Sequence, residues 1–330
     1  MAIVLAAILG VVALYCTRQR PLQWRESSGV VWTTDFHISY MAADDLNDSI
    51  RAVLQSVDRS ASVYNDSSLV ARFNAGHSVV VDAIIDTLFQ ASLMVHQQSG
   101  GAFDPTVMPL VNAWGFGYKN GELPTEAQID SILRFVGLKN VSIEGSRLIK
   151  SDSRVQLDFS SIAKGLACDE VGRMLRRNGV SHFMVEIGGE VACAGLNRQG
   201  KPWHVSVDLP TDQPYSVSHE AALVVALEQG GIATSGNYRK YRETGGKRVS
   251  HIVDPKTGRS QASDLLSVTV VAPNCMLADA WATACMVMGS ERVVQLMEGR
   301  KDLGVMTITA GSQGQLVVWS NARFAQLVVQ

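Results

Sequence analysis

Apolar residues recur along the chain at two spacings, one typical of helices and the other typical of strands. The helical spacing predicts long helices that begin after Asp44 or Asp45, near Asp82, after Asp158 and near Met276. Shorter helices are expected over residues 125–135 and 291–297, and residues 69–73 form a short helix at most. The long helices have an apolar side, which they are expected to bury.

Between these helices, runs rich in β-branched and aromatic residues predict strands. The expected strands cover residues 30–40, 141–143, 148–149, 155–157, 183–187, 191–194, 203–207, 223–227, 248–253 and 267–272. A closing hairpin is expected over residues 304–308 and 315–319. Strands and helices are mixed rather than regularly alternating, which favours an α+β fold with mixed or antiparallel sheets and packed helices, in two lobes that form one unit.

The composition fits a folded protein with a large core and argues against a nucleic-acid-binding protein. Of the 330 residues, 46% are hydrophobic, and the formal net charge is −2 without a run of lysine or arginine. The five cysteines are an odd number at wide spacing and contain no C-x-x-C pair. Neither a disulfide framework nor a structural zinc site is therefore supported, and buried free thiols are expected.

The first 20 residues differ from the rest and predict an export signal or a membrane anchor. An uninterrupted apolar run from Ala2 to Tyr15 is followed by Cys16, Arg18 and Arg20. The run is short for a spanning helix, has no basic segment before it, and places Tyr15 where a lipoprotein signal needs a small residue. A cleaved signal, an anchor, lipidation of Cys16 and a misassigned start all stay open, and residues 21–330 form the expected catalytic domain.

The stretch from Leu157 to Asp169 combines features that bind anions. An apolar run closed by Asp158 leads through two serines into a helix with Lys164 in its first turn. A helix N-terminus offers unpaired N–H groups and the positive end of its dipole, and the lysine adds positive charge. This stretch therefore suits a phosphorylated ligand with a metal, and a capped surface helix with a solvated lysine is the alternative.

Three further stretches could complete a site. Asp279 and Thr283 lie four apart on one helix, so their oxygens can share one side and suit Mg²⁺, although Asp279 could instead cap the helix. His251 precedes a turn, where it could act as a general base or could hold that turn by a hydrogen bond. The turn Ala102–Thr106 could present backbone groups to a ligand or could be an ordinary turn.

Three short motifs also match, in order, those of penicillin-recognising serine enzymes: Ser161 with Lys164, Ser235 with Asn237, and Lys256 with its two successors. In that hypothesis Ser161 would be the nucleophile. The interval between Asn237 and Lys256 is too short for the elements that those enzymes place there, and Lys256 lies in a turn rather than in a strand. This alternative is disfavoured.

Taken together, the motifs resemble those of the ApbE family of FAD:protein FMN transferases. They are Gly-Ala-Phe-Asp-Pro-Thr at 101–106, Asp-x-x-Ser-Ile-Ala-Lys-Gly at 158–165, Ala-Thr-Ser-Gly-Asn-Tyr at 233–238, His-Ile-Val-Asp-Pro-Lys-Thr-Gly at 251–258 and Ala-Asp-Ala-Trp-Ala-Thr-Ala at 278–284. The resemblance covers about residues 31–318 and implies a Mg²⁺-dependent transfer of FMN from FAD to a threonine hydroxyl of an acceptor flavoprotein, with release of AMP. The acceptor is expected to belong to a membrane redox complex.

The resemblance also implies roles for single residues, with His251 activating the acceptor hydroxyl. Ser161, Asp279 and Thr283 would surround the metal, and Ala282 stands where some relatives carry a further aspartate. Asp158 is expected to bind rather than to act as a base, because a neighbouring lysine would keep it ionised. The residues that would line the FAD site are Trp32 (where many relatives have Met-Gly-Thr in this strand), Tyr64, Ala102, Phe103, Asp104, Asp158, Lys164 and Ile252.

Two other functions stay open. A Mg²⁺-dependent FAD pyrophosphatase would use water in place of threonine, and a flavin-binding protein would not turn FAD over. The pair of Asp279 and Thr283 argues against a pure binder, because binding an isoalloxazine ring requires no metal. Family members are typically exported, which agrees with a protein that is anchored in the inner membrane facing the periplasm, or lipidated.

Overall fold

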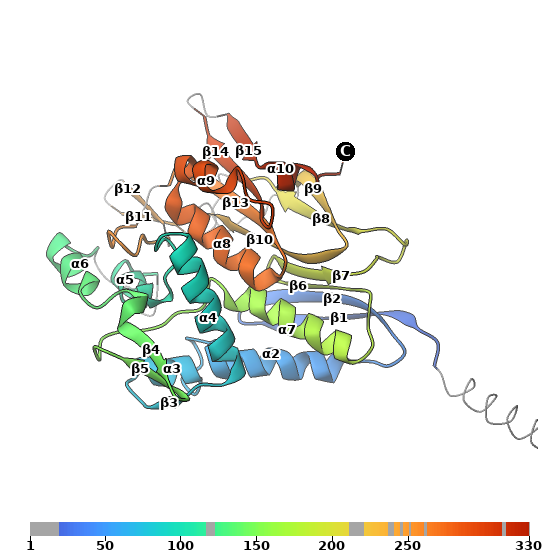
Figure 1. Ribbon diagram of the computed structural model, residues 1–330, viewed down its shortest axis with the longest axis horizontal. Helices are drawn as coiled ribbons and strands as arrows, with labels where there is room; N and C mark the ends of the chain where they lie inside the picture. Colours follow the sequence, from blue (N-terminus) through green and yellow to red (C-terminus); the bar gives the residue numbers. More distant parts are fainter. Residues whose placement is uncertain are drawn as a thin grey trace, which may run out of the picture.

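An antiparallel eight-stranded sheet forms the centre of the molecule (Figure 1). The computed structural model describes residues 20–116, 123–210, 221–236, 241–244, 247–250, 252–260, 263–311 and 315–329. The strands lie in the order β1-β2-β6-β7-β10-β13-β14-β15, and all neighbours pair antiparallel. Their bounds are β1 Gln23–Val31, β2 Thr34–Ala42, β6 Phe183–Ile187, β7 Glu190–Ala194, β10 Gln229–Gly236, β13 Leu265–Ala272, β14 Gly304–Ala310 and β15 Leu316–Ser320. The predicted α+β fold is confirmed.

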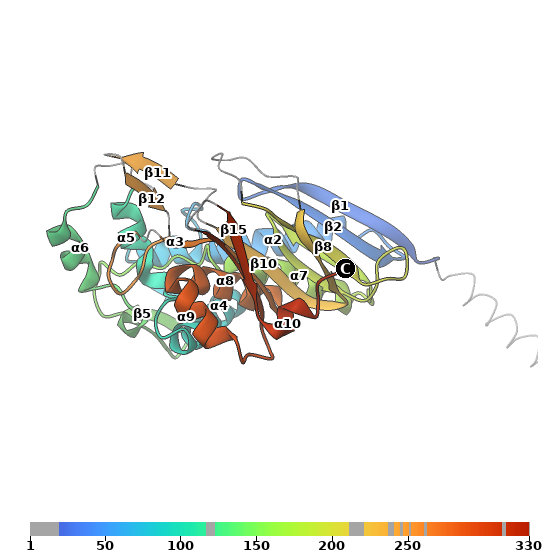
Figure 2. The ribbon, with the colours of Figure 1, turned by 90° about the horizontal axis from the view of Figure 1, so that it is seen from above.

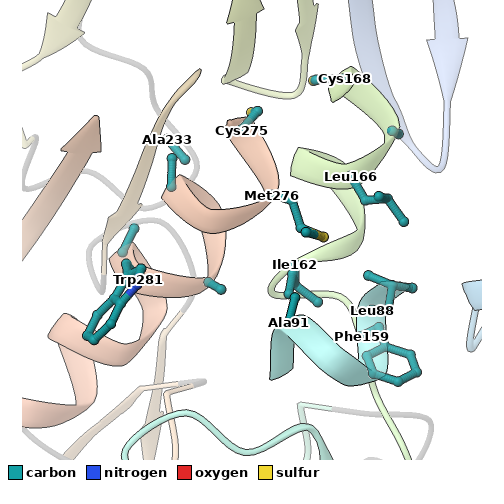
Figure 3. Packing of buried hydrophobic residues seen from close by; sticks show 14 of the residues in the cluster. Leu88, Ala91, Phe159, Ile162, Leu166, Cys168, Ala233, Cys275, Met276 and Trp281 are labelled. Carbon is teal, nitrogen blue, oxygen red and sulfur yellow. The ribbon is translucent and has the colours of Figure 1, made fainter. Parts of the chain in front are cut away.

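Helices cover one face of this sheet. α7 (Ala163–Arg177) packs on β6 and β7, and α8 (Cys275–Met288) packs on β10 and β13. α2 (Asn47–Ala61) and α4 (Ala83–Gln98) pack against these two helices (Figures 1 and 2). Figure 3 shows the contact region, where Leu88 and Ala91 of α4 lie close to Ile162 and Met276 at the meeting of α7 and α8. α9 (Ser290–Met297) follows α8.

The opposite face of the sheet is covered by the hairpin of β8 (Trp203–Asp208) and β9 (Ala221–Leu227) and by α10 (Ala322–Ala325). Trp203, Val225 and Phe324 form the apolar cluster on this side. All five residues of β7 are buried, because β7 lies between α7 and this cluster. A strand covered on both faces reads as a continuous apolar run, which is why residues 191–194 were recognisable as a strand from the sequence.

The remaining described elements form a smaller lobe, seen on the left and at the bottom of Figure 1. A three-stranded sheet, β3-β5-β4, lies beside α3, and the hairpin β11–β12 lies near α5 and α6 (Figures 1 and 2). Their bounds are α3 Leu69–Asn74, β3 Val79–Val80, η1 Pro105–Val107, α5 Met108–Ala113, α6 Glu126–Leu133, η2 Leu138–Asn140, β4 Val141–Glu144, β5 Arg147–Lys150, β11 Tyr241–Thr244 and β12 Lys247–Ser250.

The single strand predicted over residues 30–40 is wrong, because the chain reverses there and forms the hairpin of β1 and β2. Trp32 and Thr33 make the turn, with φ values of 49° and 65°. Two consecutive residues with positive φ are typical of the tight turns that connect strands, but glycine or asparagine usually occupies them. Without such a turn signal, the apolar alternation runs through the reversal and resembles one strand.

The strand predicted over residues 155–157 is also absent from the structure, which places these residues in an extended segment outside any sheet. The side chain of Asn74 accepts a hydrogen bond from the Leu157 N–H (2.7 Å) and donates one to the Leu157 carbonyl (2.8 Å). A single amide side chain therefore takes the place of a neighbouring strand. In the other direction, the prediction missed β10, whose sequence is rich in glycine and small polar residues.

Most of the N-terminal segment, residues 1–19, lies outside the described residues, so its assignment as a signal or anchor stays a prediction. Within the described part, none of the helices has the length and apolar character needed to cross a membrane. The four described cysteines are buried and free, as expected. They are Cys168, Cys193, Cys275 and Cys285.

Candidate active site

The start of α7 joins the central stretch of the sequence to the turn at Ala102–Thr106. The Asp158 N–H donates to the Pro105 carbonyl (2.7 Å), and the Asp158 carboxylate accepts the N–H of Ser160 (2.8 Å). The helix then begins at Ala163, so Lys164 lies in its first turn as predicted. Neither serine caps the helix, because the N-cap position is Ile162 and no side chain accepts a hydrogen bond there. In the first turn the Ala163 N–H donates to the Phe159 carbonyl (2.8 Å) and the Gly165 N–H to the Asp279 carboxylate (3.1 Å), so among the described residues the N–H of Lys164 is the one left for a ligand.

Lys164, Glu190 and Asp279 form a compact charged group, which we call the Lys164 cluster. Lys164 Nζ lies 2.5 Å from Glu190 Oε1, and the Lys164 side chain is 34% exposed whereas that of Glu190 is 5% exposed. Burial by itself would lower the pKa of Lys164, but attraction by Glu190 and then by Asp279 raises it overall. Lys164 is therefore a firmly charged cation that solvent, and hence a ligand, can reach.

Both carboxyl groups of the Lys164 cluster have raised pKa values. Burial is the main cause at Glu190 and at Asp279, and the attraction of Lys164 opposes it in each case. Glu190 Oε2 is buried without a hydrogen-bond partner among the described residues, and Asp279 Oδ2 accepts only the N–H of Gly165 (3.1 Å). With two carboxylates and one lysine, the cluster has an excess of negative charge when all three groups are ionised.

Asp279 does not cap α8, so the alternative role of this residue as a helix cap is wrong. The side chain of Asn274 caps α8 by accepting the N–H of Leu277 (2.9 Å), and Asp279 lies a full turn further along, 3% exposed. Thr283 lies one turn beyond Asp279, and its hydroxyl is 3.3 Å from that of Ser235 on β10. The 233–238 motif and the 278–284 motif therefore meet at Thr283.

α7 and α8 approach each other closely because Gly165 carries no side chain. A Cβ at Gly165 would lie 2.4 Å from the carbonyl oxygen of Cys275 and 2.8 Å from Cα of Met276. The side chain of Asp169 fixes the same contact by accepting the backbone N–H groups of Cys275 (2.9 Å) and Met276 (2.8 Å). This contact aligns the two helix starts and brings Lys164 near Asp279.

The turn at Ala102–Thr106 is held by hydrogen bonds to the Asp104 side chain. Asp104 Oδ1 accepts the N–H (2.8 Å) and hydroxyl (2.6 Å) of Thr106, and Oδ2 accepts the N–H of Leu138 (3.1 Å). Asp104, Ala102 and Phe103 are buried, so their side chains support the turn. Just before it, Gly101 has a φ of 84°, and a Cβ there would lie 3.0 Å from Cε of Lys256. The 254–258 turn thus lies against this one.

Trp32 and the loop that carries Tyr64 are linked by one aspartate. The Trp32 indole N–H donates to Asp58 Oδ1 (2.9 Å), and the Asn65 amide donates to Asp58 Oδ2 (2.6 Å). Tyr64 is 75% exposed, and partial burial, followed by the charge of Asp158, raises the pKa of its phenol. Trp32 lines a hollow together with Val30, Val31, Phe36, Arg51, Leu54, Gln55 and Asp58.

These contacts link Asp158 to the 102–106 turn, Lys164 to Asp279, and Thr283 to Ser235. Ile252 is buried in the same core as Ala102 and Phe103. Ser161 is half-buried in the turn before α7, and its side chain has no hydrogen bond among the described residues. His251 lies outside the described residues, so its role stays a prediction.

One expectation about the charged residues is wrong, and one disfavoured alternative is further weakened. Lys164 was expected to keep Asp158 ionised, but Lys164 pairs with Glu190, and burial raises the pKa of Asp158 against the hydrogen bonds from Ser160. The same ion pair removes the arrangement of a serine enzyme, in which Lys164 would activate Ser161. Lys256 lies in a turn, as the sequence indicated.

Sequence reasoning missed Glu190, Gly165 and Asp58. Glu190 directly follows Gly188-Gly189, whose φ values of 62° and 99° make the tight turn into β7. That turn was recognised as a place where a ligand or backbone could approach closely, and the carboxylate beside it was the available signal. Gly165 was part of the 158–165 motif, but no role was assigned to it, and Asp58 resembled an ordinary polar residue of α2.

Comparison with known proteins decides the family. The ApbE family model matches residues 32–307 of this chain. This chain belongs to the ApbE family. It is 34% identical to the FAD:protein FMN transferase of Salmonella typhimurium over 315 residues, which cover 92% of this chain and 88% of that protein. It is 35% identical to the Vibrio cholerae FAD:protein FMN transferase over 294 residues, with 86% and 87% covered.

Solved structures of ApbE proteins agree with this assignment. The flavin transferase ApbE from Vibrio cholerae superposes with a TM-score of 0.81 at 33% identity, covering 93% of this chain and all of that one. The apo form of the Pseudomonas stutzeri flavinyl transferase ApbE gives a TM-score of 0.83 at 32% identity, with 93% and 97% covered. The family resemblance and the assignment to the transferases are both confirmed.

Proposed function

We propose that this chain transfers FMN from FAD to a threonine hydroxyl of an acceptor protein, in a Mg²⁺-dependent reaction that releases AMP. The names of the ApbE relatives support flavin transfer. The observation that carries the proposal is the Lys164 cluster at the start of α7, where a reachable lysine and a helix N-terminus lie beside the buried carboxylate of Asp279. This combination suits a pyrophosphate, which is the bond that the reaction must break.

In the proposed reaction one bond forms and one breaks. The threonine oxygen attacks the phosphorus of the FMN half of FAD, the bond from that phosphorus to the bridging oxygen breaks, and AMP leaves with that oxygen. The threonine proton must go to a base, for which His251 is our candidate. Lys164 would bind the negative pyrophosphate through its ammonium group and its backbone N–H, because phosphoryl transfer depends mainly on positioning and charge neutralisation.

The residues present fit a Mg²⁺ ion. Asp279 and Thr283 offer oxygen ligands one helical turn apart, to which the Ser161 carbonyl could add, and Mg²⁺ prefers oxygen ligands with few carboxylates. The raised pKa values of Asp279 and Glu190, caused mainly by burial, show that the cluster disfavours its negative charge in the absence of a further cation. When bound, the ion would neutralise charge on the pyrophosphate. Within the described residues, no three histidine, cysteine or acidic side chains gather as ligands.

The FAD site would extend from the Lys164 cluster towards the exposed ring of Tyr64. Asp158 connects the 102–106 turn with Tyr64, since its N–H donates to the Pro105 carbonyl and its charge reaches the Tyr64 phenol. Asp58 links Trp32 to the loop of Tyr64, because it accepts hydrogen bonds from the Trp32 indole and from the amide of Asn65, the residue after Tyr64. Planar flavin rings stack well on aromatic side chains, so Trp32 and Tyr64 are our candidates for the ring-binding end. We further propose an exported enzyme, anchored or lipidated through its first 20 residues.

The test is a reaction of the full-length chain with FAD, Mg²⁺ and an acceptor domain that bears the threonine motif. We expect the acceptor to gain the mass of FMN less one water, with one AMP released for each acceptor modified. A matched acceptor with valine in place of the threonine should stay unmodified. Release of FMN and AMP with an unmodified acceptor would point to a pyrophosphatase instead, and no consumption of FAD would contradict both enzymatic functions.

A further inference from the structure

Glu190 is a buried charged group of the Lys164 cluster, and no role in the proposed reaction has yet been given to it. It is the first residue of β7 and follows the Gly188-Gly189 turn. Its side chain is 5% exposed and its Oε2 atom is buried without a hydrogen-bond partner among the described residues. An unsatisfied carboxylate oxygen is costly to bury, so a protein keeps one only where the charge has a use.

The only ion pair of Lys164 in the described structure is with Glu190. Asp279 attracts the same ammonium group electrostatically, but it forms no ion pair with it. Asp279 Oδ2 is engaged by the Gly165 N–H, and the other oxygen of Asp279 accepts no hydrogen bond from the described residues. The Glu190 carboxylate thus binds the Lys164 ammonium group, while the Asp279 carboxylate stays available for another ligand.

We propose that Glu190 is a positioning residue, which holds Lys164 away from Asp279 so that Asp279 can bind a divalent cation. The inference rests on the proposed function, because it assigns the Asp279 carboxylate to the cation. Without Glu190, the lysine would have Asp279 as its remaining carboxylate partner and would compete with the cation for it. Groups that orient metal ligands in this way typically change metal affinity 10–100-fold when they are replaced.

Direct binding of Mn²⁺, as a spectroscopic substitute for Mg²⁺, tests this role without FAD, acceptor or turnover. Electron paramagnetic resonance of free Mn²⁺ gives its affinity for the full-length chain and for each variant. We expect Glu190→Gln to weaken Mn²⁺ binding about 10–100-fold. Glu186→Gln is the matched control, because Glu186 lies in the same hairpin and pairs with the exposed His37 instead. Glu186 also accepts the N–H of Gly189 (2.7 Å), and the glutamine keeps an oxygen that can accept it, so this variant should leave the affinity unchanged.

A second background separates positioning from simple charge. In Lys164→Met there is no lysine to compete for Asp279, so the added Glu190→Gln change should weaken Mn²⁺ binding much less than it does in the natural chain. Glu190→Asp keeps the charge but is one methylene too short for the same contact, and it should resemble Glu190→Gln. The Asp variant also serves as the test if the Gln variant does not fold, as judged by circular dichroism.

Several outcomes would overturn the proposal. An equal loss of affinity in the natural and Lys164→Met backgrounds, or an Asp variant that behaves like the natural chain, would show that Glu190 acts through its charge alone. An unchanged affinity in Glu190→Gln would remove it from the cation site. A natural chain that binds no Mn²⁺ in the absence of FAD would also overturn this role, which requires the cation to bind to the protein by itself. Because Mg²⁺ can also be bound together with substrate phosphates, none of these outcomes contradicts the proposed function, which has its own assay.

Discussion

Gly165→Ala adds one methyl group where the first turn of α7 meets the start of α8, and we expect it to disturb both stability and the site. The new Cβ would lie 2.4 Å from the Cys275 carbonyl oxygen, 2.7 Å from its carbon and 2.8 Å from Cα of Met276. All three atoms belong to the backbone, so no side-chain rotation can relieve the contact. The helices must separate by about 1 Å to restore ordinary van der Waals distances.

The expected loss of stability is the balance of one stabilising and two destabilising effects. Alanine is favoured over glycine in a helix by up to about 1 kcal/mol. Overpacking of a dense contact costs about 1–3 kcal/mol, and weakening the hydrogen bond from the Gly165 N–H to the Asp279 carboxylate costs up to about 1.5–3 kcal/mol. We therefore expect the free energy of unfolding to fall by about 2–4 kcal/mol. Gly165 follows Lys164 in the chain and donates its N–H to Asp279, so a shift of Gly165 displaces both residues. FAD turnover should therefore fall as well.

Urea unfolding followed by circular dichroism measures the stability change, and Gly172→Ala is the matched control. Gly172 lies in the same helix, but its Cβ would meet the ring edge of Phe183 at 3.0 Å, and a ring can turn aside. Gly172→Ala should change the free energy of unfolding by less than about 1 kcal/mol. If both variants prove equally stable, the close contact between α7 and α8 is not what aligns the Lys164 cluster, and that reasoning is refuted.

Three other substitutions test separate parts of the site. Asp279→Asn keeps an acceptor for the Gly165 N–H but loses the charge, so folding should persist while Mg²⁺-dependent turnover is abolished; retained turnover would remove Asp279 from the metal site. Asp58→Ala releases the Trp32 indole, and we expect FAD affinity, measured by flavin fluorescence, to fall about tenfold; an unchanged affinity would exclude the Trp32 turn from the FAD site. Burial raises the pKa of Asp169 from 3.8 to about 6, so the folded state keeps a proton that the unfolded state has released, and stability should fall as pH rises from 4 to 6. Asp169→Asn should reduce this slope by about one proton, and an identical slope would contradict the raised pKa.

The sequence alone correctly predicted the helices and strands whose apolar residues follow a single period. α8 begins one residue before its predicted start and α4 begins beside Asp82, because their capping residues and stop signals agree with the helical period. The capping box of Thr125 and Gln128 is present as predicted. The failures occur where a side chain replaces a backbone partner, as Asn74 does for Leu157, or where the chain reverses without a glycine. Both depend on contacts between residues far apart or on strain that the rest of the fold supports.

The candidate site was predicted from family motifs rather than from the spacing of apolar residues. Motifs at five separate places agreed with one family, and the structure joins these places through backbone contacts, such as the one from Asp158 to Pro105, and through the hydrogen bond between Ser235 and Thr283. Which charged residues of the site form ion pairs with each other was less predictable. Lys164 and Asp158 are close in sequence, yet the helix turns Lys164 towards the sheet while the Asp158 backbone is fixed on the 102–106 turn.

Glu190 explains why charge counting along the sequence gives the wrong partner for Lys164. Within the 157–169 stretch, Lys164 has acidic neighbours at Asp158 and Asp169, but Asp169 is committed to the N–H groups of α8. The counter-charge of Lys164 comes instead from the sheet on which α7 packs. It is supplied by Glu190, which directly follows the Gly188-Gly189 turn. The start of α7 is therefore not simply a positive site: it holds a charged lysine paired with Glu190, beside a second carboxylate, Asp279, that forms no ion pair among the described residues. That imbalance favours a ligand that brings a cation and an anion together, as a metal-bound pyrophosphate does.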